Sequence, residues 1–272
     1  MSLNDAVEAI PRKSMVLFFL VDTSGSMSGS KIGAVNAAIE EVLPELRDIS
    51  ASNADAEVKI AALEFANSAN WLTPNGPVPV ETFGWNYVDA AGNTSMGEAF
   101  LKLNVALSTK TFMQDAVGSY APAIFLLSDG EPTDDFDGAV AELKNNKWFK
   151  AAIKVAVAIG DDANNSRLAQ FTGSTESVLE VHSAAMLKKM IKFVSVRASQ
   201  IASQSVQVNP AKPAATAPIT IAPANTTNSG STETTNGVDI TTGEVDSLKQ
   251  VALNSDLAQA RLIAVATGDD EW

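Results

Sequence analysis

The chain has 272 residues, of which 46% are hydrophobic and 19% are charged, and this composition is typical of a globular protein with a buried core. Its formal net charge of −13 argues against a nucleic-acid surface, which needs clustered lysines and arginines, and favours a cation as ligand. The sequence contains no cysteine, so disulfides, thiolate metal sites and cysteine nucleophiles are excluded.

The first apolar run of the chain is too short to cross a membrane. It extends from Met15 to Val21 between Lys13 and Asp22, whereas a signal sequence or a spanning helix needs a longer run with different flanks. We therefore expect a cytoplasmic protein without membrane contact. An uninterrupted apolar run of this length is typical of a strand that is buried on both faces of a parallel sheet.

Short apolar runs and amphipathic stretches alternate after this first strand. Apolar residues at helical spacing from Ile32 to Leu46 predict a helix, and residues 58–65 predict a second strand. The proline-rich stretch 67–86 favours loops with at most a short edge strand. The further expected elements are helices over 96–107, 136–144, 167–171 and 184–201, and strands over 123–127, 153–159 and 178–181. This order predicts an α/β fold, a doubly wound, Rossmann-like, mostly parallel sheet flanked by helices.

The composition changes abruptly after Gln204. Residues 209–230 consist mainly of Pro, Ala, Thr, Asn and Ser, which cannot bury enough apolar surface to fold. A weak helical pattern and an acidic end follow this stretch. We therefore divide the chain into an N-terminal segment (1–12), a folded domain (13–204), a flexible linker (205–247) and a short, acidic tail with helical character (248–272).

Three polar loops follow or precede the predicted elements at positions where α/β sheets bind ligands. Asp22, Ser24 and Ser26 come directly after the first strand, Thr94 precedes the helix over 96–107, and Asp129 follows the strand over 123–127. In open α/β sheets, ligands bind at the carboxyl ends of the strands near the reversal of strand order. Because these loops offer oxygen atoms and neither His nor Cys, they favour Mg²⁺ or Mn²⁺ over zinc.

The spacing within the first loop suits a metal site with an open position. Ser24 and Ser26 can aim two hydroxyls at one cation, while Asp22 accepts from those hydroxyls or binds the cation through water. Since the set contains only two carboxylates, the ion would keep residual positive charge. We therefore expect an acidic ligand from outside to complete the site. Thr94 or Ser95 is also a natural N-cap of the following helix.

The three loops together resemble the metal-ion-dependent adhesion site of von Willebrand factor A (VWA) domains. The resemblance is carried by Asp22-x-Ser24-x-Ser26, by Thr94 within Gly-Asn-Thr-Ser, and by Asp129 within Leu-Leu-Ser-Asp-Gly. The resemblance covers about residues 13–202. It implies a non-enzymatic module that binds Mg²⁺, with Mn²⁺ or Ca²⁺ as alternatives. It also implies a protein partner that supplies an acidic or phosphorylated residue.

Three further stretches resemble bacterial VWA proteins of the TerY type, which are linked to tellurium-resistance clusters. These stretches are residues 127–135, 148–150 and 158–162. Proteins of this type are thought to act as intracellular assembly modules, sometimes beside a kinase and a phosphatase. The resemblance implies an adaptor role in tellurium or stress resistance, or in phosphorylation-linked complexes, and it identifies no partner.

Enzymatic interpretations compete with this binding role. A Ser-His-Asp hydrolase would depend on the single histidine, His182, which follows the last strand, and no Gly-x-Ser-x-Gly elbow is present. His182 is better interpreted as a structural or surface residue. A phosphate-binding P-loop would need a lysine after glycine, whereas Lys31 follows Ser30. A metal-dependent phosphohydrolase with Asp22 as nucleophile stays open as the alternative, although such enzymes normally carry a second carboxylate at the position of Ser24.

Other polar and aromatic residues near the three loops have simpler interpretations. Several acidic residues suit solvated positions at helix starts rather than extra ligand positions. These residues are Asp134, Asp135, Asp137, Asp161 and Asp162. Trp71, Trp85 and Tyr87 lie in the loops before Thr94 and suit either core packing or contact with a partner.

Overall fold

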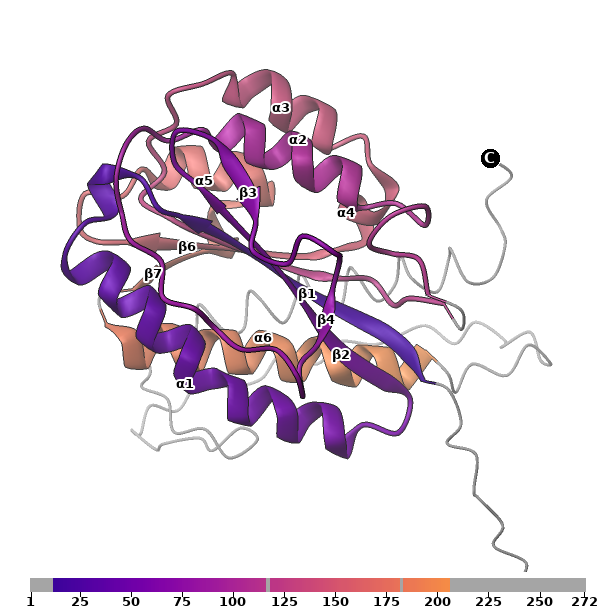
Figure 1. Cartoon of the computed structure of the whole chain (residues 1–272). Helices are drawn as coiled ribbons and strands as arrows, with labels where there is room; N and C mark the ends of the chain where they lie inside the picture. The colour runs from indigo at the N-terminus through magenta and orange to yellow at the C-terminus, as the bar shows by residue number, and fades with distance from the viewer. Residues whose placement is uncertain (1–11, 116–117, 182, 206–272) are drawn as a thin grey trace, which may run out of the picture.

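In the computed structural model, which describes residues 12–115, 118–181 and 183–205, one sheet lies between two layers of helices (Figure 1). The described residues exclude His182 and the predicted tail. They also exclude the predicted N-terminal segment except Arg12, and the predicted linker except Ser205. Within the described ranges, no helix combines the length and the apolar character that a membrane span requires.

Seven strands of the described chain form one mixed, mostly parallel sheet in the order β3-β2-β1-β5-β6-β7, with β4 paired to β2. Their bounds are β1 Lys13–Asp22, β2 Ala56–Phe65, β3 Ala69–Trp71, β4 Val78–Pro79, β5 Ala123–Ser128, β6 Ile153–Ile159 and β7 Val178–Val181. Only β3 and β4 pair antiparallel, both with β2. The chain adds β2 on one side of β1 and β5 on the other. The strand order therefore reverses at β1, and its carboxyl end is the expected ligand position.

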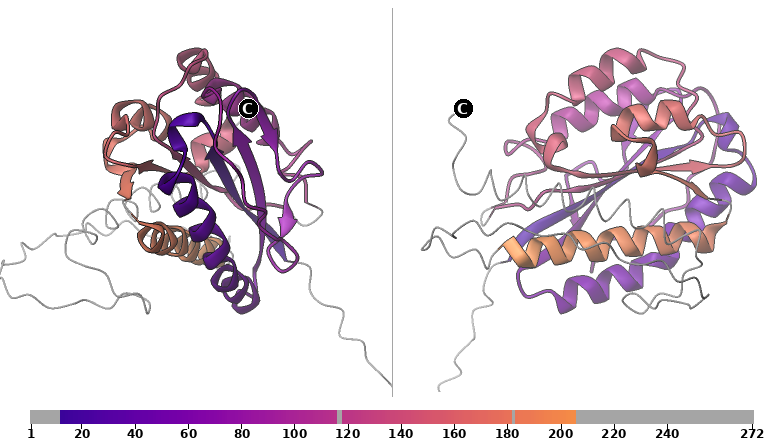
Figure 2. Two further views of the ribbon diagram at one scale, coloured as in Figure 1. Left: turned by 60° about the vertical axis from the view of Figure 1, so that its left-hand side comes forward. Right: turned by 180° about the vertical axis from the view of Figure 1, so that it is seen from behind.

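The helices cover the two faces of the sheet unequally (Figures 1 and 2). Helices α1 and α6 pack together on one face, and α2, α3 and α5 lie on the other. The helix bounds are α1 Ser30–Ser52, α2 Met96–Ala106, α3 Phe136–Leu143, α4 Lys147–Ala151, α5 Asn165–Thr172 and α6 Ala184–Ser205. Short 3-10 turns span Gly25–Met27 and Thr175–Ser177. This arrangement confirms the predicted doubly wound α/β fold.

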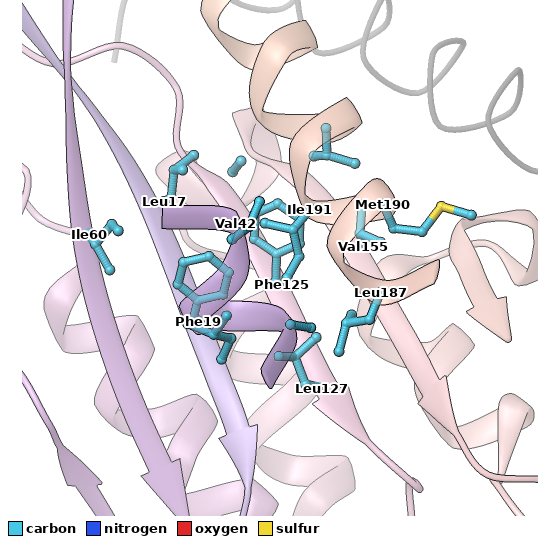
Figure 3. Packing of buried hydrophobic residues seen from close by; sticks show 14 of the residues in the cluster. Leu17, Phe19, Val42, Ile60, Phe125, Leu127, Val155, Leu187, Met190 and Ile191 are labelled. Carbon is cyan, nitrogen blue, oxygen red and sulfur yellow. The ribbon is translucent and has the colours of Figure 1, made fainter. Parts of the chain in front are cut away.

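Strand β1 is buried on both of its faces. Leu17 and Phe19 point toward α1 and α6, where they pack with Phe125 of β5 and Ile191 of α6 (Figure 3). The alternate residues, including Phe18, pack in the second core with α2, α3 and α5. Each fully buried large apolar side chain stabilises the fold by roughly 1.5–3 kcal/mol. The strand therefore holds the loop at its carboxyl end in a fixed position.

Several local features differ from the expectations drawn from the sequence, and three of them concern α1, β3 and α4. Helix α1 continues six residues beyond Leu46, and in this extension Ser50 is buried and its hydroxyl bonds the Glu81 carboxylate at 2.7 Å. Strand β3 was not predicted, because three residues are too few to show a period. Helix α4 was not predicted either: it spans five residues and depends on the Asn146 side chain, which accepts from the N–H groups of Trp148 and Phe149.

Candidate metal centre

Asp22 ends β1, and its carboxylate is fully buried. Its Oδ1 accepts from the backbone N–H of Ser24 at 2.8 Å, and its Oδ2 accepts from the hydroxyl of Ser128 at 2.5 Å. Burial raises the pKa of Asp22; the bonds from Ser128 and Ser24 oppose this rise, and the nearby charge of Asp129 adds to it. Asp22 is therefore a desolvated anchor that ties the first loop to the end of β5.

The two serines of the first loop lie next to each other. Ser24 Oγ and Ser26 Oγ are 3.0 Å apart; Ser24 is buried and Ser26 is exposed. Gly25, between them, lies close to the next loop: its N–H donates to the carbonyl of Gly92 at 2.9 Å, and an added Cβ would lie 3.2 Å from that oxygen. The two hydroxyls are thus close enough to bind one cation, as the spacing predicts.

Backbone hydrogen bonds hold Thr94 between the two other loops. The N–H of Ala91 donates to the carbonyl of Thr23 at 2.8 Å, which ties this segment to the first loop. On the other side, the N–H of Thr133 donates to the carbonyl of Thr94 at 2.9 Å, and the N–H of Thr94 donates to the hydroxyl of Thr133 at 3.1 Å. Thr94 is buried. The fold therefore fixes all three predicted loops at one edge of the sheet.

The two carboxylate oxygens of Asp129 have different environments. Oδ2 lies 3.1 Å from the ammonium of Lys31. Oδ1 is buried and has no hydrogen-bond partner in the described part of the chain. Buried polar atoms normally have a partner, because an unsatisfied one costs about 1–3 kcal/mol or more when charged. A bound cation would satisfy this oxygen.

The residues present fit a hard divalent cation. Ser24, Ser26 and Thr94 offer hydroxyls, and Asp129 offers the unpartnered oxygen. In the described ranges, no group of three or more His, Cys, Asp or Glu side chains is placed to hold a metal. A site here would therefore depend on hydroxyls, carry little negative charge and suit Mg²⁺ better than zinc.

Lys31 and Asp162 are site residues that the sequence interpretation missed. Lys31 Nζ lies 2.7 Å from Asp162 Oδ1 in addition to its contact with Asp129. Burial lowers the pKa of Lys31, but its bonds to Asp162 and Asp129 outweigh this effect and raise it. The bond from Lys31 lowers the pKa of Asp162, which is exposed as predicted but paired. Lys31 and Asp129 are 98 residues apart in sequence, so no local pattern could reveal their contact.

The acidic loop after β5 caps two helices. The Asp134 carboxylate accepts from the N–H groups of Gly97 and Glu98 at 2.9 Å each, at the start of α2. The sequence favours Thr94 or Ser95 for this role, but the side chain of Ser95, at the N-cap position, makes no capping bond. Asp135 caps α3, and Asp137 pairs with Arg167. These three acids are at helix starts, as predicted.

The three aromatic residues before Thr94 divide between packing and surface. Trp71 lies against the rings of Phe18 and Phe112, and Trp85 packs on the core and donates to Asn36 Oδ1 at 3.0 Å. Asn36 also accepts from the N–H of Val88, so the segment that leads to Thr94 is fixed on α1. Tyr87 is exposed and bonds Glu40.

Comparisons with known proteins identify the family. The model of the von Willebrand factor type A domain matches residues 17–193, and the chain belongs to this family. No curated protein matches the chain. Domains of this family are in general non-enzymatic modules for protein interaction and are often metal-dependent.

Solved structures share the fold at low sequence identity. A von Willebrand factor type A protein from Catenulispora acidiphila is 17% identical with a TM-score of 0.51, and the alignment covers 69% of this chain and 43% of that chain. The pilus adhesin SpaC from Lactobacillus rhamnosus GG is 13% identical with a TM-score of 0.52, covering 69% and 30%. Proximal thread matrix protein 1 from the mussel byssus is 14% identical with a TM-score of 0.51, covering 69% and 48%. The chain thus spans less than half the length of each of these structures.

Proposed function

We propose that this domain binds a divalent cation, with Mg²⁺ as the first candidate, and uses it to bind a protein partner. Ser24, Ser26, Thr94 and Asp129 would hold the ion directly or through water, while Asp22 anchors the first loop. The observation that carries this proposal is the buried, unpartnered Oδ1 of Asp129 at the edge where the three loops meet. A cation supplies the missing partner of this oxygen.

The partner would contribute a carboxylate or a phosphate to the ion. The site has only two carboxylates, and the ammonium of Lys31 already pairs with one of them. A divalent ion there keeps positive charge that an external anion can neutralise. We further propose a cytoplasmic adaptor role in assemblies of the kind that the TerY-type resemblance implies, in tellurium or stress resistance or beside phosphorylation enzymes.

Calorimetric titration with Mg²⁺ and Mn²⁺ tests the metal site. Ser26→Ala removes one ligand hydroxyl, and we expect it to weaken binding at least about tenfold, since a bond to a charged group contributes roughly 1.5–3 kcal/mol. The matched control is Ser28→Ala, which removes an exposed hydroxyl two residues further on that bonds only weakly, at 3.4 Å, to the Ala90 carbonyl. Equal affinity in wild type and Ser26→Ala would contradict the proposed site.

The alternative phosphohydrolase function gains no support from the geometry of Asp22. A nucleophilic carboxylate must reach the phosphorus atom, whereas Asp22 is fully buried and both of its oxygens accept hydrogen bonds. Assay of a phosphomonoester such as p-nitrophenyl phosphate with Mg²⁺ tests this function directly. Metal-dependent turnover that Asp22→Asn abolishes would revive it.

A further inference from the structure

The ammonium of Lys31 bridges a buried carboxylate and an exposed one. Lys31 is the second residue of α1, and its side chain is 16% exposed. The Asp129 side chain on one side is 3% exposed, and the Asp162 side chain on the other is 71% exposed. The lysine therefore occupies the border between the buried metal loops and solvent.

The turn after β6 is shaped to admit the Lys31 side chain. Gly160 has a φ of +93°, and a Cβ added there would lie 2.5 Å from Lys31 Cε. The positive φ favours glycine at this position, and the absence of a side chain lets the Lys31 stem pass close to the turn. The turn after β6 thus contacts the lysine at two positions: Gly160 leaves room for its stem, and Asp162 pairs with its ammonium.

We infer that Lys31 is a fixed cation of the metal centre, which weakens binding of the free metal and strengthens binding of an anionic group by the loaded centre. This inference rests on the proposed function. Lys31 takes Oδ2 of Asp129 and leaves Oδ1 for the metal, so one carboxylate is shared between two cations. The metal gains less from Asp129 than it would from an unpaired carboxylate.

The same charge favours an anion once the metal is bound. Asp129 is the one carboxylate among the proposed ligands, because Asp22 anchors the first loop, so a divalent ion keeps residual positive charge there. Lys31 adds one positive charge that is partly exposed, and the charge of its partner Asp162 is more strongly screened by solvent because that side chain is 71% exposed. The attraction between the Lys31 ammonium and an anion at the metal is stronger than in bulk water and weaker than in a protein interior. Removal of Lys31 should therefore change the affinity for the anion by about tenfold or more. Lys31 thus lowers the affinity for the metal and raises the affinity for the partner's carboxylate or phosphate.

Lys31→Met in the full chain tests both halves of the inference. We expect it to bind Mg²⁺ about tenfold more tightly in calorimetry. Relaxation of water protons by the Mn²⁺-loaded protein then reports displacement of bound water by acetate and, in a second series, by methyl phosphate. We expect Lys31→Met to bind both anions about tenfold more weakly, with the larger loss for the more highly charged methyl phosphate. Lys31→Gln, also neutral but polar, should shift both affinities in the same directions.

Lys59→Met is the matched control, because Lys59 also lies between two carboxylates and has a similarly small exposed fraction. It should leave both affinities unchanged. Absence of Mg²⁺ binding by wild type would refute the proposed function itself. Mg²⁺ binding by wild type, together with weaker Mg²⁺ binding by Ser26→Ala, would support the metal site. Given that result, the role of Lys31 alone is refuted if both Lys31 variants bind Mg²⁺ no more tightly than wild type, or if they bind the anions equally well.

Discussion

Lys31 and Lys59 each bridge two carboxylates, but only Lys31 borders a candidate binding site. Lys59 Nζ in β2 lies 2.8 Å from Asp115 Oδ2 and 3.3 Å from Glu57 Oε2, and its side chain is 21% exposed. Lys31 has the same arrangement with Asp129 and Asp162. Lys59 precedes the end of β2, Phe65, by six residues, so it is about 20 Å along the strand from the edge that holds the metal loops.

The two lysines differ in the hydrogen bonding of the more buried carboxylate beside each of them, Asp129 beside Lys31 and Asp115 beside Lys59. Asp115 accepts from the hydroxyl of Ser14 as well as from Lys59, whereas Oδ1 of Asp129 has no partner within the described residues. Both groups have similar charges, so charge alone does not distinguish a structural ion pair from a ligand site. The unpartnered oxygen favours a ligand site because buried polar atoms normally have a partner, and it lies where the three loops meet, unlike unpartnered buried atoms elsewhere in the described chain such as Ser195 Oγ.

Removal of Lys31 should have the largest effect on stability, and Mg²⁺ should partly reverse it. In EDTA, Lys31→Met leaves the buried Asp129 charge without any partner, and we expect a loss of about 3 kcal/mol in the free energy of unfolding. In saturating Mg²⁺ the cation neutralises this charge, and the roughly tenfold tighter binding to the folded state restores about 1.4 kcal/mol of the loss. Urea unfolding with and without Mg²⁺ measures both values. A loss that is the same in EDTA and in Mg²⁺ would show that the metal does not bind at Asp129.

Removal of Lys59 should cost less, and the loss should not depend on metal. Lys59→Met leaves Asp115 and Glu57, which are partly exposed, with like charges close together, and we expect a loss of about 2 kcal/mol. The hydroxyl of Ser14 still bonds Asp115, which limits the loss. The same urea experiment measures it. If Mg²⁺ restored the stability of Lys59→Met, the structural interpretation of this group would be wrong.

The contrast also explains what the sequence could predict. The fold followed from the alternation of short apolar runs, such as Leu17 to Val21, with amphipathic helices, which is typical of a parallel sheet covered on both faces. The candidate loops followed from polar residues directly after strands. The contacts of Lys31 with Asp129 and of Asp134 with α2 did not, because each joins segments that are far apart in sequence and carry no shared pattern. The predicted ligand residues remain a prediction until metal binding is measured.

The smallest effect concerns the pH dependence of the Lys59 group. Burial lowers the pKa of Lys59, but its bond to Asp115 and the charge of Glu57 outweigh this and hold it above its ordinary value of 10.5. A raised pKa in the folded state means that the ion pair contributes fully below about pH 10.5 and is lost as the pH rises through the folded value.

The stability difference between wild type and Lys59→Met should therefore be constant from pH 8 to about pH 10 and shrink above about pH 10.5. Urea unfolding of both proteins across this range measures the difference, and the titration of the remaining lysines cancels because both proteins share them. A difference that grows with pH would mean that burial, and not the carboxylates, dominates at Lys59. In that case Lys59 would no longer be comparable with Lys31, and of the two groups only the carboxylates around Lys31, at the edge of the sheet that holds the metal loops, would stabilise their lysine.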